Sequence, residues 1–183
     1  MYTGHVALAL ATRGVRRDLP LFVLVFASQG YDWVELGARL FLSRRAAEVY
    51  SHAFPFTLVA ASSVGLAAWL WKRSVSAALT VMALYLSHAL ADYVTGLKPL
   101  WWGGPPVGLR LIERPVADFI VQATVCVVGF AVYVRSLAVR RTSLVRFAVG
   151  TPLVLLLSLQ AVSDFLVYLQ VERRQRSSLD TPS

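Results

Sequence analysis

Long apolar runs alternate with short polar segments along most of the chain, and this pattern predicts membrane-spanning helices. Each long run has about the 20 apolar residues that a helix needs to cross the hydrocarbon core of a bilayer. The four runs cover residues 53–71, 75–94, 116–134 and 149–169. We therefore expect an all-α, polytopic integral membrane protein with about four transmembrane helices.

Two shorter apolar runs precede these spans and predict an N-terminal helical hairpin. They cover residues 4–11 and 19–28, and both are too brief to cross a bilayer. A basic turn over residues 13–17 separates them, and Asp18 is placed to cap the second helix. The hairpin returns the chain to the side on which it began.

Composition agrees with one membrane domain over residues 1–170, followed by a polar C-terminal tail over residues 171–183. The chain is 57% hydrophobic, and its mean hydropathy of +0.60 exceeds that of an ordinary soluble domain. We expect a multi-pass membrane protein. Cys126 is the only cysteine, so no intrachain disulfide can form.

The net charge of +8 comes mainly from arginines that lie between apolar runs. That placement is typical of cytoplasmic loops and lipid headgroup contacts. We therefore expect membrane lipid as the partner and no binding of nucleic acid.

The candidate chemistry begins with His88 and Asp92, which are four residues apart in the second long run. This spacing places both side chains on one face of a helix. An imidazole and a carboxylate are costly to bury unpaired among apolar residues. A bound metal ion or a hydrogen bond between the two groups would offset that cost.

Alternation of the predicted spans brings the other ionisable residues to the same end of the helices. Ser51 is a candidate helix cap, which would put His52 in the first turn of the first long span. All three histidines of the chain then share one face with three aspartates. The residues on this face are His5, Asp32, His52, His88, Asp92 and Asp118.

Three imidazoles and two carboxylates suit a divalent metal ion, with zinc as the first choice and manganese as the alternative. The expected ligands are His5, Asp32, His52, His88 and Asp92. A catalytic site also needs an open position and a base, and Asp32 is the carboxylate best placed to accept a proton from water.

Other interpretations of the same residues stay open. His88 and Asp92 alone would also serve as a hydrogen-bonded pair that steadies helix packing. Intramembrane ionisable groups mark transport pathways as well, and a structural metal site needs no chemistry. Asp118 and Gln122 are expected to pack behind the site more often than to bind the ion. Glu35 and Glu48 are expected to pair with Arg39, Arg44 and Arg45, and either could also reach a nearby ion.

The motifs resemble those of the YdjM-like family of LexA-regulated, membrane-bound, metal-dependent hydrolases. The likeness covers residues 1–115. The family pattern has Gly-His near the N-terminus, Pro-Asp at the end of the first hairpin, Thr-His-Ser at the start of a span, and Ser-His-x-x-x-Asp-x-x-Thr before a Pro-Leu-Leu-Trp loop. Here these motifs are Gly4-His5, Tyr31-Asp32, Ser51-His52, Ser87-His88 through Asp92 to Thr95, and Pro99-Leu100-Trp101.

The resemblance implies a metal-dependent hydrolase in the cytoplasmic membrane, with a distant likeness to zinc-dependent phospholipases C. Tyr31 stands where the family usually has proline, and Ala47 occupies a position that is often histidine. These departures leave one metal site better supported than two. The expected activity is attack of activated water on an ester or phosphoester of a lipid-like or other small substrate.

Overall fold

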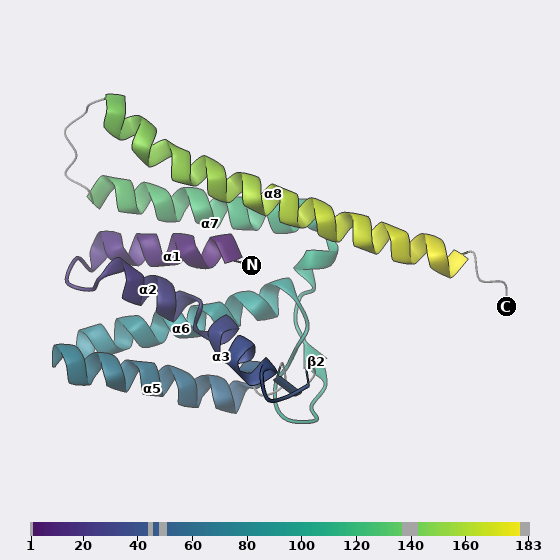
Figure 1. Cartoon of the computed structure of the whole chain (residues 1–183), viewed down its shortest axis with the longest axis horizontal. Coiled ribbons are helices and arrows are strands. Elements are labelled where there is room, and N and C mark those ends of the chain that lie inside the picture. Colours follow the sequence, from purple (N-terminus) through teal and green to yellow (C-terminus); the bar gives the residue numbers. More distant parts are fainter. Residues whose placement is uncertain (1, 44–45, 48–50, 137–142, 180–183) are drawn as a thin grey trace.

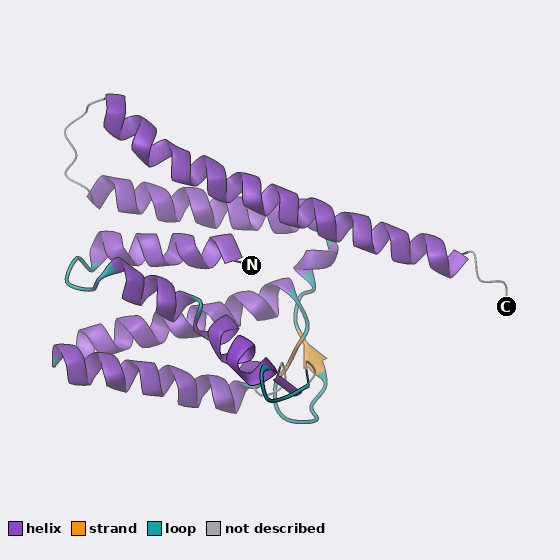
Figure 2. Ribbon diagram, viewed as in Figure 1, coloured by secondary structure: helices purple, strands orange, loops and turns teal. Residues whose placement is uncertain are grey.

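Helices account for nearly all of the regular structure in the described part of the chain (Figure 2). The structure is a computed structural model and describes residues 2–43, 46–47, 51–136 and 143–179. The α-helices are α1 (Tyr2–Val15), α2 (Leu21–Ser28), α3 (Gly30–Arg39), α5 (Phe54–Lys72), α6 (Val75–Thr95), α7 (Pro115–Ser136) and α8 (Ser143–Leu179).

In the part of the chain that the structure describes, four helical segments are long and apolar enough to cross a membrane, which confirms the predicted all-α membrane fold. They are α5, α6, α7 and the Leu153–Gln170 part of α8. Large apolar side chains such as Leu66, Val128 and Leu159 are exposed on these helices. Exposed apolar surface on a helix of this length suits contact with lipid.

The helices pack in the order α8, α7, α1, α2, α6 and α5 (Figure 1). The short helix α1 therefore lies between the long helices α7 and α6, with α2 beside it. Among the four candidate spans α6 is the most enclosed, since 39% of its apolar window is buried, against 11% for α8. The helix that carries His88 and Asp92 is thus the best surrounded by protein.

Small residues allow α1 and α7 to pack closely. A Cβ atom on Gly129 of α7 would lie 2.5 Å from the carbonyl oxygen of Ala7 on α1. Gly14, two turns further along α1, lies similarly close to the backbone of Val132. Small residues at helix contacts are the usual means of close packing in membrane proteins.

The basic turn between α1 and α2 is tied to the start of α6. The guanidinium of Arg16 donates to the Ser76 carbonyl at 2.9 Å and to the Thr80 hydroxyl at 2.8 Å. Asp18 does not cap α2 as expected, because it accepts from Arg16 instead. That hydrogen bond lowers the pKa of the exposed Asp18 carboxyl to about 2.

The polar segment between α6 and α7 contains a small hairpin that the sequence analysis did not predict. Strands β1 (Lys98–Pro99) and β2 (Pro106–Val107) pair antiparallel, and the 3-10 helix η1 (Leu111–Glu113) follows. Gly108 has a φ of +153°, and a Cβ atom there would lie 1.8 Å from the Gly96 carbonyl oxygen. Only glycine fits this position.

One expected helix boundary was wrong. Helix α5 begins at Phe54 after Ala53, so His52 precedes that helix, and Ser51 contacts the His52 ring instead of capping. The segment expected as a polar tail from residue 171 continues α8 as helix to Leu179.

We predict that Gly129→Ala will lower the thermal stability of the detergent-purified protein. The added methyl group meets the backbone of Ala7, which can yield only if α1 moves away from α7, at a cost of about 1–3 kcal/mol. Thermal unfolding followed by circular dichroism measures the effect.

Gly37→Ala in α3 is the matched control, because nothing lies within 4 Å of a Cβ atom there. Alanine is the better helix former, so this variant should be unchanged or slightly more stable. Equal melting temperatures for the two variants would contradict the close approach of α1 and α7.

Candidate metal centre

Five ionisable side chains meet at the end of the bundle that holds the first residues of α1 and the last turns of α6. His5 comes from α1, Asp32 from α3, and His52 from the residue pair before α5. His88 and Asp92 lie one turn apart on α6. Contacts described below join all five into one cluster, which is the set that the sequence analysis selected. Their roles as ligands stay predictions.

Asp92 is the centre of the cluster. Its Oδ2 atom lies 3.0 Å from Nε2 of His52 and 3.4 Å from Nε2 of His88. The Asp92 side chain is only 12% exposed, and both imidazoles are almost fully buried. A buried carboxylate is tolerable in this position because His52 donates a hydrogen bond to this oxygen, and His88 adds a positive charge beside it when both of its ring nitrogens are protonated.

The ring of His88 is oriented by the backbone of α2. Its Nδ1 atom lies 2.7 Å from the Ser28 carbonyl oxygen, which can only accept a hydrogen bond. Nδ1 therefore carries the proton, and Nε2 is directed toward the carboxylates of Asp92 and Asp32, the latter at 3.7 Å. Metal-binding histidines commonly have this arrangement, because a backbone acceptor fixes the tautomer of the ligand.

His52 is held by a hydroxyl on one side and a carboxylate on the other. The Ser51 hydroxyl lies 2.6 Å from Nδ1, and its proton allows Nδ1 to accept while Nε2–H donates to Asp92. Glu35 also approaches Nδ1, at 3.8 Å. His52 is thus linked to the neighbouring acidic groups through both of its ring nitrogens.

His5 has no such partner. It is 1% exposed, and its ring stacks on that of His88 with the centroids 3.8 Å apart. Both of its ring nitrogens are buried without a hydrogen bond. A buried polar group left in this state costs about 1–3 kcal/mol, so native structures rarely keep one without a reason.

A metal ion would supply the missing partner. One ligand atom each from His5, His88 and Asp92 lies within 4.8 Å of the other two. This three-residue group is the only one with potential metal-ligand geometry in the described part of the chain. Two imidazole nitrogens and a carboxylate oxygen form a donor set that suits zinc, and modest closure would bring them to ligand distance.

Asp32 lies on the outer side of the cluster, beside an open pocket. Its side chain is 30% exposed, and burial raises the pKa of its carboxyl above the ordinary value. The pocket has a volume of about 350 Å³. Its lining residues are Gln29, Asp32, Trp33, Glu35, Leu36 and Arg39. A small substrate group in this pocket would lie next to the cluster.

Aromatic residues and the hairpin segment enclose the rest of the cluster. Tyr31, which is fully buried, stacks on His88 at 5.2 Å and packs against Tyr85 at 4.7 Å between ring centroids. The Tyr93 hydroxyl lies within hydrogen-bond distance of the His52 carbonyl and of the Pro99 carbonyl in β1. The loop after α6 is therefore fixed over the residues that hold His52.

Some residues of this site escaped the sequence analysis. Ser51 was expected as a helix cap and Tyr31 only as a replacement for proline, yet both contact the histidines. The orienting group of His88 is the Ser28 backbone carbonyl, which no sequence pattern reveals. Glu35 pairs with Arg39 as expected and also approaches His52. Glu48, Arg44 and Arg45 lie outside the described residues.

Asp118 lies apart from this cluster. It forms a second polar group with Gln122, Gln160 and Thr3 on the far side of α1. Asp118 and Gln122 were expected to pack behind the metal site, and this was wrong, because they form a hydrogen-bonded group with residues of α1 and α8 instead.

No family model, no curated protein and no solved structure matches the chain. The likeness to the YdjM-like family therefore stays a prediction that depends on the motifs quoted above.

We predict that His5→Phe will not destabilise the metal-free protein, whereas His52→Phe will. Phenylalanine at position 5 keeps the stacked ring and removes two unpartnered nitrogens, but at position 52 it leaves Asp92 and Ser51 without their partner. The second loss should cost about 1–3 kcal/mol.

Thermal unfolding after dialysis against a chelator measures both effects. A lower melting temperature for His5→Phe than for His52→Phe would show that the His5 nitrogens have a protein partner, contrary to the structure.

Proposed function

We propose that this protein is a membrane-embedded hydrolase that depends on a divalent metal ion. Zinc is the favoured ion and manganese the alternative. The proposed substrate is an ester, most of all a phosphoester, of a lipid-like molecule. In this proposal the chain is a divergent member of the YdjM-like family and crosses the cytoplasmic membrane several times.

The observation that carries the proposal is the state of His5. Its two ring nitrogens are buried and unpartnered, and the ring lies against His88 beside Asp92. A packing device would gain nothing from an imidazole at this position, because a phenyl ring would stack equally well without a polar cost. Coordination of a metal ion gives the nitrogen a function.

The proposed ligands are His5, His88 and Asp92, with His52 placed to orient Asp92 or to join the ligand set. Three protein ligands leave a position open, which is the arrangement of catalytic zinc sites. When bound, the ion would act as a Lewis acid that makes water a stronger nucleophile near neutral pH.

Asp32 is the proposed general base. Its carboxylate lies 3.7 Å from Nε2 of His88, and it borders the 350 Å³ pocket. A water molecule between the cluster and this pocket would be within reach of Asp32, which would accept its proton as the water attacks the ester. Partial exposure of Asp32 lets the proton pass on to solvent.

Features of the pocket favour an anionic, amphiphilic substrate. The guanidinium of Arg39 lines it and is paired with Glu35 on its own helix. Arginine is suited to phosphate groups because its planar donors match phosphate oxygens. Trp33 and Leu36 add exposed apolar surface at the same pocket, which suits a substrate at the level of the lipid headgroups.

A non-enzymatic membrane protein is the alternative, with a structural metal site or a polar transport pathway in the same position. A structural zinc site is closed by four protein ligands. The open pocket beside Asp32 favours the enzyme, because a purely structural ion would not need access to the surface.

We predict about one zinc or manganese ion per chain in the detergent-purified parent protein, and its loss in a His88→Ala, Asp92→Ala double variant. Removal of two of three ligands should abolish stoichiometric binding. Elemental analysis by mass spectrometry gives the metal content, and circular dichroism tests whether each variant stays helical.

Two further variants make this measurement decisive. His5→Ala removes a proposed ligand without breaking a hydrogen bond, so it should lose the ion and still fold. Asp18→Asn alters an exposed carboxylate at the α1–α2 turn and should keep the ion. A parent protein that stays metal-free after reconstitution with excess zinc or manganese would refute the proposal of a metal-dependent hydrolase.

We predict that Asp32→Asn will retain the ion but lose activity by about 10²–10⁴-fold, as expected for removal of a general base. Hydrolysis is measured on phosphoesters and carboxylic esters of lipids in mixed micelles. Failure of the metal-loaded parent to cleave any of them, with the ion bound, would favour the structural or transport role.

A further inference from the structure

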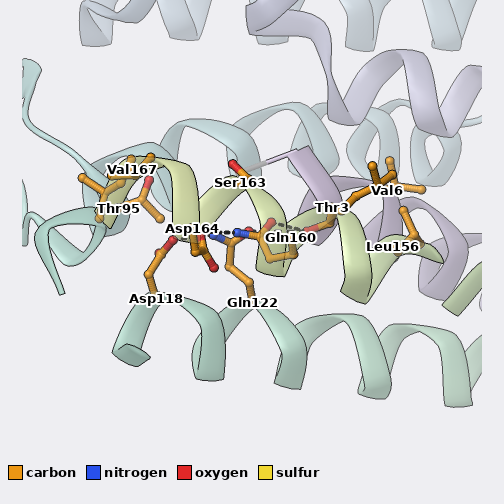
Figure 3. A pocket seen from close by; sticks show the side chains of 12 residues that line it. Thr3, Val6, Thr95, Asp118, Gln122, Leu156, Gln160, Ser163, Asp164 and Val167 are labelled. Carbon is orange, nitrogen blue, oxygen red and sulfur yellow. Dashed lines mark hydrogen bonds between the residues drawn. The ribbon is translucent and has the colours of Figure 1, made fainter. Parts of the chain in front are cut away.

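A second polar cluster lies on the opposite side of α1, between α7 and α8 (Figure 3). It lines a cavity of about 440 Å³. Its polar members are Thr3, Asp118, Gln122, Gln160, Ser163 and Asp164. Thr3 faces this cavity, whereas His5 faces the candidate metal centre, so two different faces of α1 serve the two sites.

The hydrogen bonds within the cluster leave one oxygen free on each aspartate. The side-chain amide of Gln122 donates to Oδ2 of Asp118 at 2.7 Å. On α8 the amide of Gln160 donates to Oδ1 of Asp164, also at 2.7 Å. Oδ1 of Asp118 and Oδ2 of Asp164 are buried, and no hydrogen-bond donor in the described part of the chain reaches either atom.

These two carboxyl groups are strongly enclosed and close together. Asp118 is 2% exposed and Asp164 is 7% exposed. Figure 3 shows them next to each other, and they are near enough to repel each other as carboxylates and to share a hydrogen bond when one of them is protonated. Two buried negative charges that repel each other need a positive partner or protons.

No basic residue lines the cavity among the residues that the structure describes. Apart from protons and the α-amino group of the chain, whose charge also acts on Asp118, a positive partner would therefore have to come from a ligand. The cluster also has a further acceptor that is only weakly used. The hydroxyl of Thr3 donates to the amide oxygen of Gln160 at 2.6 Å, and it lies 3.5 Å from the amide oxygen of Gln122. The missing ligand should thus offer several hydrogen-bond donors along with its charge.

The remaining walls of the cavity are apolar. They are formed by Val6, Ile112, Leu156, Leu159 and Val167, and Thr95 lies beside Val167 (Figure 3). A bare metal ion would leave most of this volume empty, since one water molecule needs only about 30 Å³. Pockets that combine apolar walls with a few convergent polar groups typically hold organic ligands.

We propose that this cavity binds a primary ammonium group attached to an apolar chain. The three N–H donors of such a group match the two free carboxylate oxygens and the weakly occupied amide oxygen of Gln122. A phosphate on the same molecule would meet no basic partner here, so the ligand is an alkylamine and not an aminophospholipid. This site does not depend on the proposed hydrolase activity.

The experiment is isothermal titration calorimetry of the whole protein in an uncharged detergent at neutral pH. Hexylamine is the probe, with hexyltrimethylammonium and hexanol as matched ligands that lack, respectively, the N–H donors and the charge. Hexylamine should bind saturably and at least about tenfold more tightly than either, because charge-assisted hydrogen bonds dominate the recognition.

Variants locate the binding. Asp118→Asn and Asp164→Asn keep the size of the side chain and should each weaken hexylamine binding by about tenfold or more. Asp18→Asn, which alters an exposed carboxylate at the α1–α2 turn, should bind like the parent. Prior treatment with a chelator should leave hexylamine binding unchanged, which separates this site from the metal centre.

Several results would overturn the proposal. Equal binding of hexanol would show an apolar cavity that ignores charge. A heat of binding with sodium or calcium ions but none with hexylamine would show a metal-ion site. An absence of binding by all three ligands would mean that the two carboxyl groups are satisfied by protons. If the asparagine variants do not fold, the affinities of the parent protein for hexylamine, hexyltrimethylammonium and hexanol still test the proposal.

Discussion

The cost of burying ionised groups among apolar helices is the constraint on which this structure depends. Asp92 is tolerable in α6 because the rings of His52 and His88 converge on one of its oxygens. That convergence requires the start of α5, the end of α6 and the end of α2 to meet at one level. The contacts within the polar cluster therefore depend on how the long helices pack, and that packing in turn is favoured because it satisfies the cluster.

The short helix α1 extends this arrangement to the rest of the bundle. Its small residues allow α7 to approach closely, as the contact between Gly129 and Ala7 shows. His5 then faces the metal centre on one side of α1, and Thr3 faces the second cavity on the other. One helix too short to cross a bilayer thus contributes to two polar sites, which explains why Thr3 and His5 are so completely buried.

Much of the fold and of the first site could be predicted from the sequence. Hydropathy shows where each membrane-spanning helix begins and ends, and because successive helices cross in opposite directions, chain order shows which helix ends lie on the same side. The hairpin of β1 and β2 was missed because two-residue strands leave no periodic pattern. Gln160 and Asp164 were missed although they repeat the i, i+4 spacing of Asp118 and Gln122, which was noticed. That spacing in the last span was the available signal for the second cavity.

By itself the sequence determined that the chain forms apolar helices of spanning length and that its three histidines share one end of them, because both properties follow from composition and chain order. Only the tertiary structure decided which polar atoms are paired. Ser28 orients His88, while His5 and the aspartates of the second cavity keep free atoms. Such pairing depends on distances between helices far apart in the chain, which side-chain packing sets and local sequence patterns do not encode.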